Sequence, residues 1–321
     1  MEIRPARPDD LDALLAFPFD AAVGSLDPQR LREELEAGRL RWPWTWVAVD
    51  DDGALVGRAL WWGRADSSAP LSLDGLDVLA SVPDRTRLAT DLLERAHRAL
   101  AAAQPGPAGP PAYELTLPPR WRAAPAAVDA ATWRVRAAAA AGLGHQLERL
   151  RYEWHPGAGV PGTTGRVRFR AGSEEEFLDV FEQAAVGTLD DTTLRALTEM
   201  GPAAQARDDH DFYLSCPGER DWWRIATAAD GEPVGFVVPS ATPYARNVGY
   251  LGVVPAHRGR GLVDDLLAEV TRVHAAEGAE RITATTDTAN SPMAAAFDRA
   301  GYRVTEVRLV LSAQAAAHSP G

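Results

Sequence analysis

The chain has 321 residues, and its 33 Lys and Arg against 45 Asp and Glu give a formal net charge of −12. This length allows two ordinary domains. The acidic balance argues against a general nucleic-acid-binding protein, which needs a basic surface, and leaves room for a cationic acceptor such as an amine. The single cysteine, Cys216, excludes an internal disulfide.

The sequence carries no signal for a membrane or a metal. The N-terminus lacks the apolar core of a signal peptide, and no run approaches the roughly 20 apolar residues of a membrane span. The 7 histidines are scattered and show no zinc-ligand spacing. We expect a soluble, cytoplasmic protein without a membrane partner, a nucleic-acid partner or a metal ion.

The first half of the chain predicts a mixture of strands and helices. In chain order, we expect a strand at 3–7, helices at 9–17 and 28–37, and a hairpin formed by strands 44–49 and 55–62. There follow a strand-like run at 71–82, a helix at 88–96, a Pro- and Gly-rich loop at 104–111, a strand at 113–117, a helix at 128–141 and a strand at 147–154.

The same pattern restarts in the second half. A strand at 167–171, a helix at 174–183 and a hairpin of strands 222–228 and 234–238 repeat the opening of the chain. We therefore expect two copies of one unit, at 1–155 and 166–313, joined by a linker at 156–165 and followed by a flexible tail at 314–321. Each copy is predicted as an α/β domain, α+β in layout, whose central, mostly antiparallel, twisted mixed sheet is flanked by helices.

The strongest chemical signal lies between a predicted strand at 248–254 and a predicted helix that begins at Leu262. The N-terminus of a helix has N–H groups without partners inside the helix and is the positive end of its dipole. Gly259 and Gly261 have no Cβ, so a phosphate can approach the backbone closely. Arg258 and Arg260 add positive charge. The loop therefore predicts an anion cradle of the size of a pyrophosphate.

This loop differs from two common phosphate-binding loops. Asp264 stands where the dinucleotide pattern has its third glycine, and there is no Gly-Lys-Ser/Thr of a nucleoside-triphosphate loop. Residues 258–263 resemble the signature Arg/Gln-x-x-Gly-x-Gly/Ala of the GCN5-related N-acetyltransferases, which binds the pyrophosphate of acyl-coenzyme A. Val263 departs from the small residue at the last place. The resemblance is strong over 247–312 and faint elsewhere.

A second motif follows the predicted strand at 281–286. Asn290 precedes a short predicted helix, for which Ser291 is the expected N-cap, and Gly301 ends that helix. This order resembles the second coenzyme-A motif of the same family. The family usually has a tyrosine at the place of Phe297, and that tyrosine often protonates the departing thiolate. The usual general acid is therefore missing here.

The resemblance implies that a neutral amine attacks the thioester of acetyl-coenzyme A or of another short acyl-coenzyme A. The pyrophosphate is assigned to Arg258 or Arg260 and to the amides of Gly259, Arg260, Gly261, Leu262 and Val263. The pantetheine arm is assigned to the strand residues Leu251, Gly252 and Val253, and the oxyanion to the N–H of Val253 or its neighbour. Asn290 and Phe297 are expected beside the coenzyme. Gly252 allows a bulge that separates this strand from the next, or provides packing clearance.

Proton transfer has several candidate residues. Tyr250 replaces the missing tyrosine as an acid, or it lines the core or the substrate wall. Asp287 faces the cleft, or it caps a loop. Asp190 and Asp191 fall where the family places its acceptor loop, and they attract an ammonium or form an exposed turn.

The first copy differs at the place of the anion loop. Residues 81–83 are expected to end its strand, and the following residues contain no glycine. Side chains there would crowd a pyrophosphate, and Asp84 would repel one. We expect the first copy to have lost coenzyme A; a variant site of Arg85, Thr86 and Arg87 is the alternative.

The two-copy layout resembles mycothiol synthase and related tandem acetyltransferases. The resemblance implies an acyl-coenzyme-A-dependent N-acyltransferase, with acetyl as the expected group and a small-molecule amine as the acceptor. One alternative is an enzyme that modifies protein or peptide amines. Another is a non-catalytic module that binds acyl-coenzyme A. The acceptor's identity and the oligomeric state are not readable from the residues.

Overall fold

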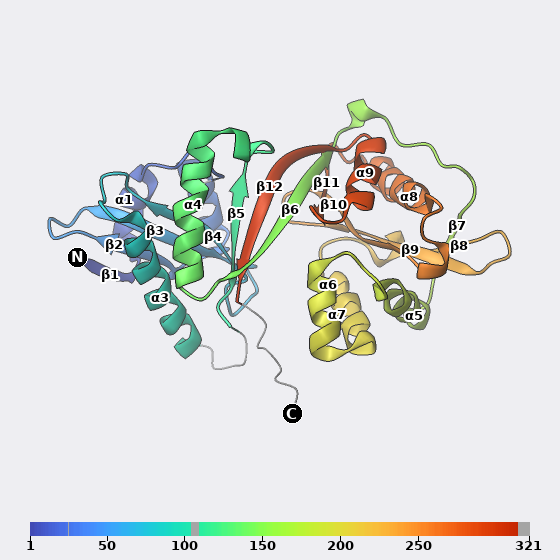
Figure 1. The fold of residues 1–321 in the computed structure, drawn as a ribbon, viewed down its shortest axis with the longest axis horizontal. Coiled ribbons are helices and arrows are strands. Elements are labelled where there is room, and N and C mark those ends of the chain that lie inside the picture. The colour runs from blue at the N-terminus through green and yellow to red at the C-terminus, as the bar shows by residue number, and fades with distance from the viewer. Residues whose placement is uncertain (25, 104–108, 314–321) are drawn as a thin grey trace. The chain divides into compact units, whose positions relative to one another are not determined.

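A computed structural model describes residues 1–24, 26–103 and 109–313. It divides into two compact units, one formed by Met1–Glu148 with the segment from Glu306 onward, and one formed by Arg149–Thr305 (Figure 1). The predicted tail at 314–321 and part of the predicted loop, 104–108, lie outside the described residues.

The first unit contains a mixed sheet in the order β1-β2-β3-β4-β5-β12. Its strands are β1 (Glu2–Pro5), β2 (Leu40–Val49), β3 (Leu55–Trp62), β4 (Ser72–Val78), β5 (Ala112–Leu117) and β12 (Arg303–Ser312). Its helices are α1 (Leu11–Ala16), α2 (Pro28–Glu36), α3 (Arg85–Ala103) and α4 (Pro125–Ala140), with 3-10 turns at Pro8–Asp10 and Trp121–Ala123. β4 and β5 are parallel, and the other pairs are antiparallel.

Helices cover both faces of this sheet because successive strand residues point to opposite faces. Val47 and Leu60 pack with α1 and α2 on one face. On the other face, the ring of Trp61 meets the ring of His97 from α3 at 5.8 Å. The core of the first unit therefore consists of two layers, one on each side of the strands.

The second unit contains a sheet in the order β6-β11-β10-β9-β8-β7. Its strands are β6 (His145–Trp154), β7 (Arg168–Arg170), β8 (Arg224–Thr227), β9 (Pro233–Ala241), β10 (Arg246–Val253) and β11 (Ile282–Asp287). Its helices are α5 (Glu174–Ala185), α6 (Asp191–Met200), α7 (Pro202–Ser215), α8 (Leu262–Ala276) and α9 (Ser291–Arg299), with 3-10 turns at Pro156–Ala158, Arg220–Trp222 and Pro255–His257. β10 and β11 are parallel, and the other pairs are antiparallel.

The helices of the second unit also cover both faces of its sheet (Figure 1). Val237 of β9 packs with α8 and α9 on one face. Its neighbours Phe236 and Val238 pack with α5 and α7 on the other. The alternation along one strand thus separates two hydrophobic clusters.

The last strand of each sheet comes from the other half of the sequence. β6 follows α4 in the chain, yet its residues 149–154 pair with β11. β12 follows α9, and its residues 307–311 pair with β5. The compact units are therefore not the same as the two predicted sequence copies, whose boundaries at 155 and 166 remain a proposal about duplication.

The predicted fold class, a mixed sheet flanked by helices, is confirmed in both units. Two elements were missed, α6 and α7, and two local predictions are wrong. β4 ends at Val78, so residues 81–83 do not end this strand. Asn290, not Ser291, is the N-cap of α9, because its side chain accepts the N–H of Met293.

No helix within the described residues has the length and apolar character to cross a bilayer. Nor do the described residues contain a cluster of His, Cys, Asp or Glu side chains that suits a metal ion.

Candidate functional site

The site of the second unit begins where β10 separates from β11. Parallel pairing covers Arg246 and Asn247 and is not found beyond them among the described residues. On the other side of β10, the register with β9 shifts between Asn247 and Tyr250, which places a bulge at residues 248–249. The bulge redirects β10 and leaves one edge of it open.

The bulge depends on Gly249. Its φ is 70°, and a Cβ there would lie 2.0 Å from the carbonyl oxygen of Val238, so only glycine fits. The predicted bulge at Gly252 is therefore misplaced, since pairing through that residue is regular. A Cβ on Gly252 would lie 2.8 Å from a ring carbon of Phe236, which makes packing clearance its role.

The open edge of β10 offers free backbone groups. The N–H of Val254 donates to Val234 of β9 over 3.0 Å. Because neighbouring strand residues alternate in direction, the N–H groups of Val253 and Leu251 point to the opposite, open edge. A cavity of about 340 Å³ follows this edge to the loop at 257–263.

The predicted anion loop has the expected backbone. Gly259 and Gly261 have φ values of 73° and 70°, which explains why both are glycine. Nothing lies within 4 Å of a Cβ placed on Gly259, so the loop surface is open there. Gly261 is the N-cap of α8, and the N–H groups of Leu262 and Val263 at the start of that helix have no partner inside it.

The two arginines of the loop differ. Arg260 is exposed, and its side chain makes no hydrogen bond or ion pair within the part of the chain that the structure describes. Arg258 donates to four carbonyl oxygens, those of Val253, Ala184, Val186 and Gly187, at 2.6–3.0 Å. Burial lowers the pKa of Arg258. Arg260 is thus free for a phosphate, whereas Arg258 connects the end of β10 to the end of α5.

Residues of the predicted linker, together with Arg166 just after it, hold the anion loop in place, which the sequence did not indicate. Arg166 donates to the carbonyls of Arg260 and Gly261 at 2.6 and 3.2 Å. The backbone N–H of Thr164 donates to the buried carboxylate of Asp265 on α8 at 2.6 Å. These contacts fix the loop from the side of its carbonyls and leave its N–H groups available.

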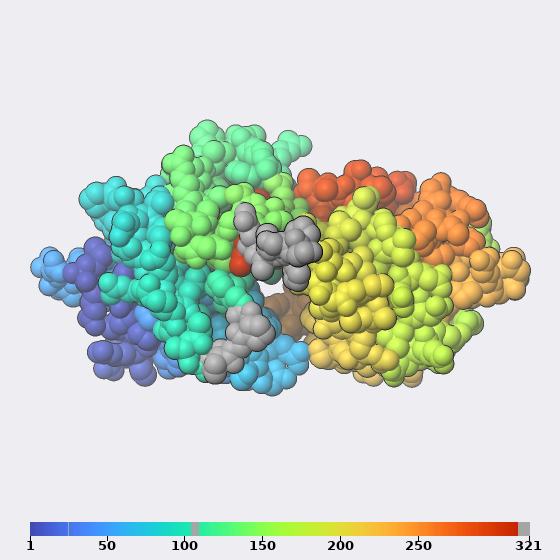
Figure 2. All heavy atoms as spheres, turned by 60° about the horizontal axis from the view of Figure 1, so that its bottom comes forward, coloured from blue at the N-terminus to red at the C-terminus, as the bar shows by residue number. Residues whose placement is uncertain are grey.

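A second cavity, of about 510 Å³, adjoins the first. Five residues line both cavities: Thr188, Tyr250, Leu251, Asn290 and Met293. The second cavity extends to α6, α7, β6 and β11, and it is lined by the carboxylates of Asp190, Asp208 and Asp209 and by the threonines Thr192, Thr193, Thr285 and Thr286. Figure 2 shows α6 and α7, in yellow, at the surface of this unit.

Tyr250 lies where the two cavities meet. Its ring stacks on Tyr213 of α7 at 5.5 Å and contacts Phe181 and Phe236 edge-on at 5.2 and 4.8 Å. Burial, with a contribution from Asp209, raises the pKa of Tyr250 well above its usual value. The phenol therefore stays protonated at neutral pH and is a hydrogen-bond donor.

Asp287 and Asp190 fix the entrance to α6. Asp287 is 1% exposed, accepts Nε of Arg149 at 2.9 Å with one oxygen and accepts the N–H of Asp191 at 2.7 Å with the other. Burial raises its pKa despite these contacts. Asp190 caps α6 by accepting the N–H of Thr193 at 2.8 Å. Of the roles left open for Asp287, the geometry favours a cap of this loop.

Asn290 and Phe297 are the N-cap of α9 and a residue within that helix, and both line the second cavity. Asn290 caps α9 and lines both cavities. Phe297 is 2% exposed, and its ring stacks on Tyr152 at 4.7 Å and lies 5.3 Å from the ring of Tyr302. Phe297 also lines the second cavity and is not among the residues that line the first.

The first unit repeats the geometry of β10 in β4. Among the residues that the structure describes, β4 pairs with β5 in parallel only at Ser72 and Leu73, and its register with β3 shifts beside Gly75. Counting from these pairs, Asp77 takes the place of Leu251. Arg134 lies as far before Gly142, which follows α4, as Met293 lies before Gly301, which follows α9. Arg134 therefore takes the place of Met293.

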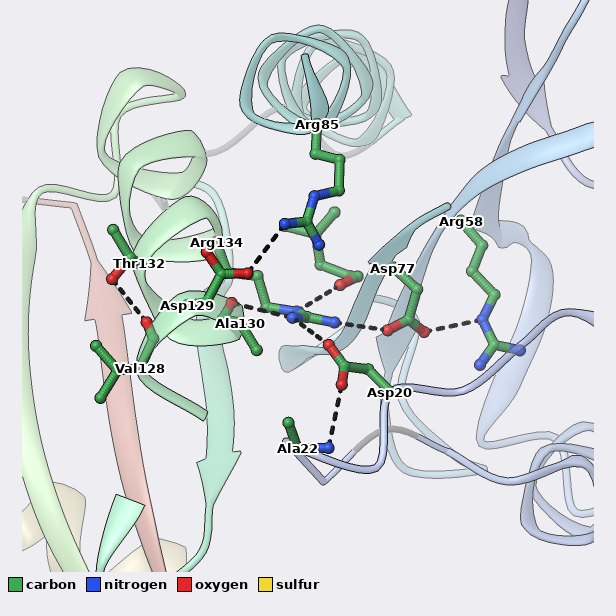
Figure 3. A network of polar contacts seen from close by, with 11 residues as sticks. Asp20, Ala22, Arg58, Asp77, Arg85, Val128, Asp129, Ala130, Thr132 and Arg134 are labelled. Atoms are coloured by element: carbon green, nitrogen blue, oxygen red, sulfur yellow. Dashed lines mark hydrogen bonds and ion pairs between the residues drawn. The ribbon is translucent and has the colours of Figure 1, made fainter. Parts of the chain in front are cut away.

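Charged side chains gather at the corresponding place in the first unit (Figure 3), where they line a cavity of about 420 Å³. Arg134 donates to the Leu76 carbonyl at 2.9 Å, and to Asp77 and Asp20 at 3.0 Å each. Asp77 also accepts Arg58 at 3.0 Å, and Arg58, Asp77 and Arg134 are between 1% and 3% exposed. This network lies at the position that the open edge has in the second unit, and Asp20, Asp77 and Arg134 line the cavity there.

Several groups at the start of α3, the helix after β4, already have partners within the protein. The carboxylate of Asp84 accepts the N–H of Arg87 at the start of α3 over 2.9 Å. Arg85 pairs with Asp129 at 3.1 Å, and Arg87 pairs with Asp91 at 3.0 Å. These partners argue against the alternative site built from Arg85, Thr86 and Arg87.

Comparison with known proteins agrees with the expected family for the second unit. Residues 190–302 match the family model described as "Acetyltransferase (GNAT) family". This match confirms the resemblance over that segment. No curated protein matches the chain in sequence.

Solved structures resemble nearly the whole chain in fold. A GCN5-related N-acetyltransferase from Sphaerobacter thermophilus is 17% identical with a TM-score of 0.55, over 96% of this chain and 94% of that one. A glucosamine N-acetyltransferase region in a fungal multi-domain GH3 β-N-acetylglucosaminidase is 14% identical with a TM-score of 0.55, over 96% of this chain and 38% of that one. A tandem GNAT protein from the clavulanic acid biosynthesis pathway is 19% identical with a TM-score of 0.49, over 100% and 99%. At these identities, the likeness of the first two shows the fold.

Proposed function

We propose that the second unit transfers the acyl group of acetyl-coenzyme A, or of another short acyl-coenzyme A, to the nitrogen of a small-molecule amine. The observation that carries this proposal is the meeting of two cavities at Tyr250 and Leu251, beside the open edge of β10. One cavity leads to the anion loop, and the other is lined by carboxylates and threonines. A donor and an acceptor can approach each other only where both cavities are open.

The residues present fit the coenzyme. The open surface at Gly259, the N–H groups of Leu262 and Val263 at the start of α8 and the exposed Arg260 suit a pyrophosphate. Leu251 and Val253 offer backbone groups to an extended, amide-rich arm, as an added strand would use them. When bound, the coenzyme supplies an activated acyl thioester.

The residues of this chain then have distinct tasks. The N–H of Val253 faces the open edge and stabilises negative charge on the thioester oxygen. Tyr250 donates a hydrogen bond to the departing sulfur. The carboxylates of the acceptor-side cavity attract the ammonium form of the acceptor. Asp287 keeps the start of α6 in place rather than touching the acceptor.

The alternatives differ in the acceptor. The acceptor-side cavity of about 510 Å³ has the size of a small-molecule site and thereby favours a small amine over a protein lysine. We also propose that this chain is related to mycothiol synthase and similar tandem acetyltransferases. This relationship does not identify the acceptor. A binding module without catalysis would need the anion loop but no acceptor-side cavity.

The proposal is tested by calorimetry with acetyl-coenzyme A, followed by thiol release during incubation with glucosamine, spermidine, lysine, phenethylamine and a lysine-containing peptide. We expect tight binding and thiol release with a small amine, whose product carries the acetyl group on nitrogen by mass spectrometry. Release with the peptide alone would favour the protein-modifying alternative. Binding without release would favour the binding module.

A further inference from the structure

α7 carries two side chains that reach the acceptor-side cavity one helical turn apart, Asp209 and Tyr213. The ring of Tyr213 stacks on Tyr250 with an angle of 14°, and its hydroxyl lies 3.4 Å from the carbonyl oxygen of Gly249. Asp209 is thus positioned beside the bulge and the junction of the two cavities. Neither residue was singled out from the sequence, because α7 itself was not predicted.

Asp209 differs from the other carboxylates near this junction. Asp287 uses both oxygens in hydrogen bonds, and Asp190 caps α6 and lies 3.6 Å from Arg149. Asp208 is exposed. The side-chain amide of Gln205 donates to Oδ2 of Asp209, and Oδ1 of Asp209 accepts no hydrogen bond from the described residues. Asp209 therefore combines partial burial with a free acceptor oxygen.

The surroundings make Asp209 a stronger base than an ordinary aspartate. Burial raises its pKa to about 6, and the negative charges of Asp208 and Asp190 act in the same direction. The hydrogen bond from Gln205 opposes this shift. The other titratable or charged groups around the cavity are Arg149, Asp287, Tyr213 and Tyr250. At neutral pH the carboxylate is still ionised and able to take a proton.

We propose that Asp209 is the general base of the acyl transfer, which rests on the proposed function of this site. Its carboxylate takes one proton from the acceptor ammonium and leaves a neutral amine. The amine nitrogen then bonds to the thioester carbonyl carbon, the C–S bond breaks, and its electron pair goes to sulfur. A second proton passes from nitrogen to the sulfur, the third stays on the amide, and Asp209 releases its proton to solvent.

The test compares Asp209→Asn with Asp211→Asn, using acetyl-coenzyme A and the most active small amine of the panel above. Asp211 is the matched control, since it is an exposed aspartate on the same helix and is not among the residues that line the two cavities. The amide introduced by Asp209→Asn keeps an oxygen for the side chain of Gln205, and melting temperature together with coenzyme affinity reports on folding. We expect Asp209→Asn to lower kcat about a hundredfold or more, with an unchanged KM for the coenzyme. Asp211→Asn should stay within about threefold of the parent.

A base leaves a signature in pH that a structural role does not. For Asp209→Asn, kcat should rise about tenfold per pH unit as the amine itself loses its proton, and Asp209→Glu should restore part of the rate at neutral pH. A kcat retained by Asp209→Asn, or a loss confined to the KM of the amine, overturns the proposal. If the parent protein binds acetyl-coenzyme A but acylates no amine, the proposed function has failed and this inference fails with it.

Discussion

Nε of Arg258 lies 3.0 Å from the carbonyl oxygen of Val253. The same guanidinium donates hydrogen bonds to three further carbonyl oxygens at the end of α5. Its hydrogen bonds are therefore made to the protein rather than to a ligand. The neighbouring Arg260 has an exposed side chain. Two arginines of one motif are therefore expected to affect coenzyme binding by different physical routes.

We expect Arg260→Gln to weaken acetyl-coenzyme A binding most at low salt, because exposed charges are screened as ionic strength rises. Arg258→Gln should weaken binding about equally at about 50 mM and about 500 mM salt and lower the melting temperature, since the partly buried carbonyls of Val253 and Ala184 lose this partner at a cost of about 1–3 kcal/mol. Titration calorimetry at the two salt concentrations measures both effects. The same salt dependence in both variants would show that Arg258 also contacts the phosphates.

Gly249 provides a second prediction, on backbone geometry. Alanine there has to adopt a φ of 70° and place a methyl group 2.0 Å from a carbonyl oxygen, which requires the bulge to move. We expect Gly249→Ala to cost more than about 2 kcal/mol of unfolding free energy and to abolish coenzyme binding. Gly231→Ala is the control, because Gly231 also has a positive φ, 93°, but has open space around it. Its cost should stay near about 1 kcal/mol in urea unfolding. Equal costs would mean that the contact with Val238 is relieved easily.

The two units should differ in ligand binding. We expect calorimetry to give one coenzyme A per chain, because the start of α3 has no glycine in place of the anion loop and its Arg85 and Arg87 are paired with carboxylates. Arg134→Met should destabilise the protein by about 3–5 kcal/mol, since it leaves the buried Asp77 with one cationic partner fewer. The stoichiometry should remain one. Two equivalent sites in the parent protein would refute the asymmetry.

Sequence reasoning located the anion loop because its signals are local. The glycines, the arginines and the apolar spacing after Leu262 all lie within a few residues, and the helix begins where they indicate. The role of Arg258 was not predictable in this way, because its carbonyl partners are up to 74 positions distant in the chain. The bulge was placed at the wrong glycine for the same reason, since Val238 on β9 decides it.

α7 was missed because its buried face is polar. The residues that it buries are Gln205, Ala206 and His210, so the apolar periodicity that signals a helix is absent. The exchange of the last strands was also not predictable, because β6 and β12 follow the same local pattern whichever sheet they complete. The candidate base Asp209 was not singled out from the sequence, because it lies on α7, which was not predicted.

The buried side chain of His274 predicts how the stability of the protein depends on pH. Burial lowers the pKa of His274 to about 4, while its Nε2 contacts the Asn247 carbonyl at 2.8 Å. The unfolded chain binds the proton with the ordinary pKa of about 6.5, so it takes up more protons than the folded chain between these values. Stability should therefore fall as pH decreases from about 6.5 towards about 4, by up to about 3 kcal/mol from this group. Urea unfolding at about pH 7 and about pH 4.5 measures the fall, and His274→Gln should make it smaller. An unchanged slope in that variant would assign the pH dependence to other groups.

The last prediction concerns the hydrogen-bond donor for the departing sulfur. Tyr250 lines both cavities, and burial keeps its phenol protonated across the working pH range. We expect Tyr250→Phe to lower kcat about a hundredfold with both KM values nearly unchanged, as for the loss of a donor that acts in the transition state.

Phe297→Tyr supplies the contrast for this test. Phe297 is 2% exposed and stacks on Tyr152, so a hydroxyl added there should not replace that of Tyr250. The double variant, which combines Tyr250→Phe with Phe297→Tyr, should have the same kcat as Tyr250→Phe in a stopped assay of thiol release. A loss limited to the acceptor's KM in Tyr250→Phe would make this ring a pocket wall. Recovery of kcat in the double variant would instead show that the usual tyrosine position of the family still reaches the sulfur.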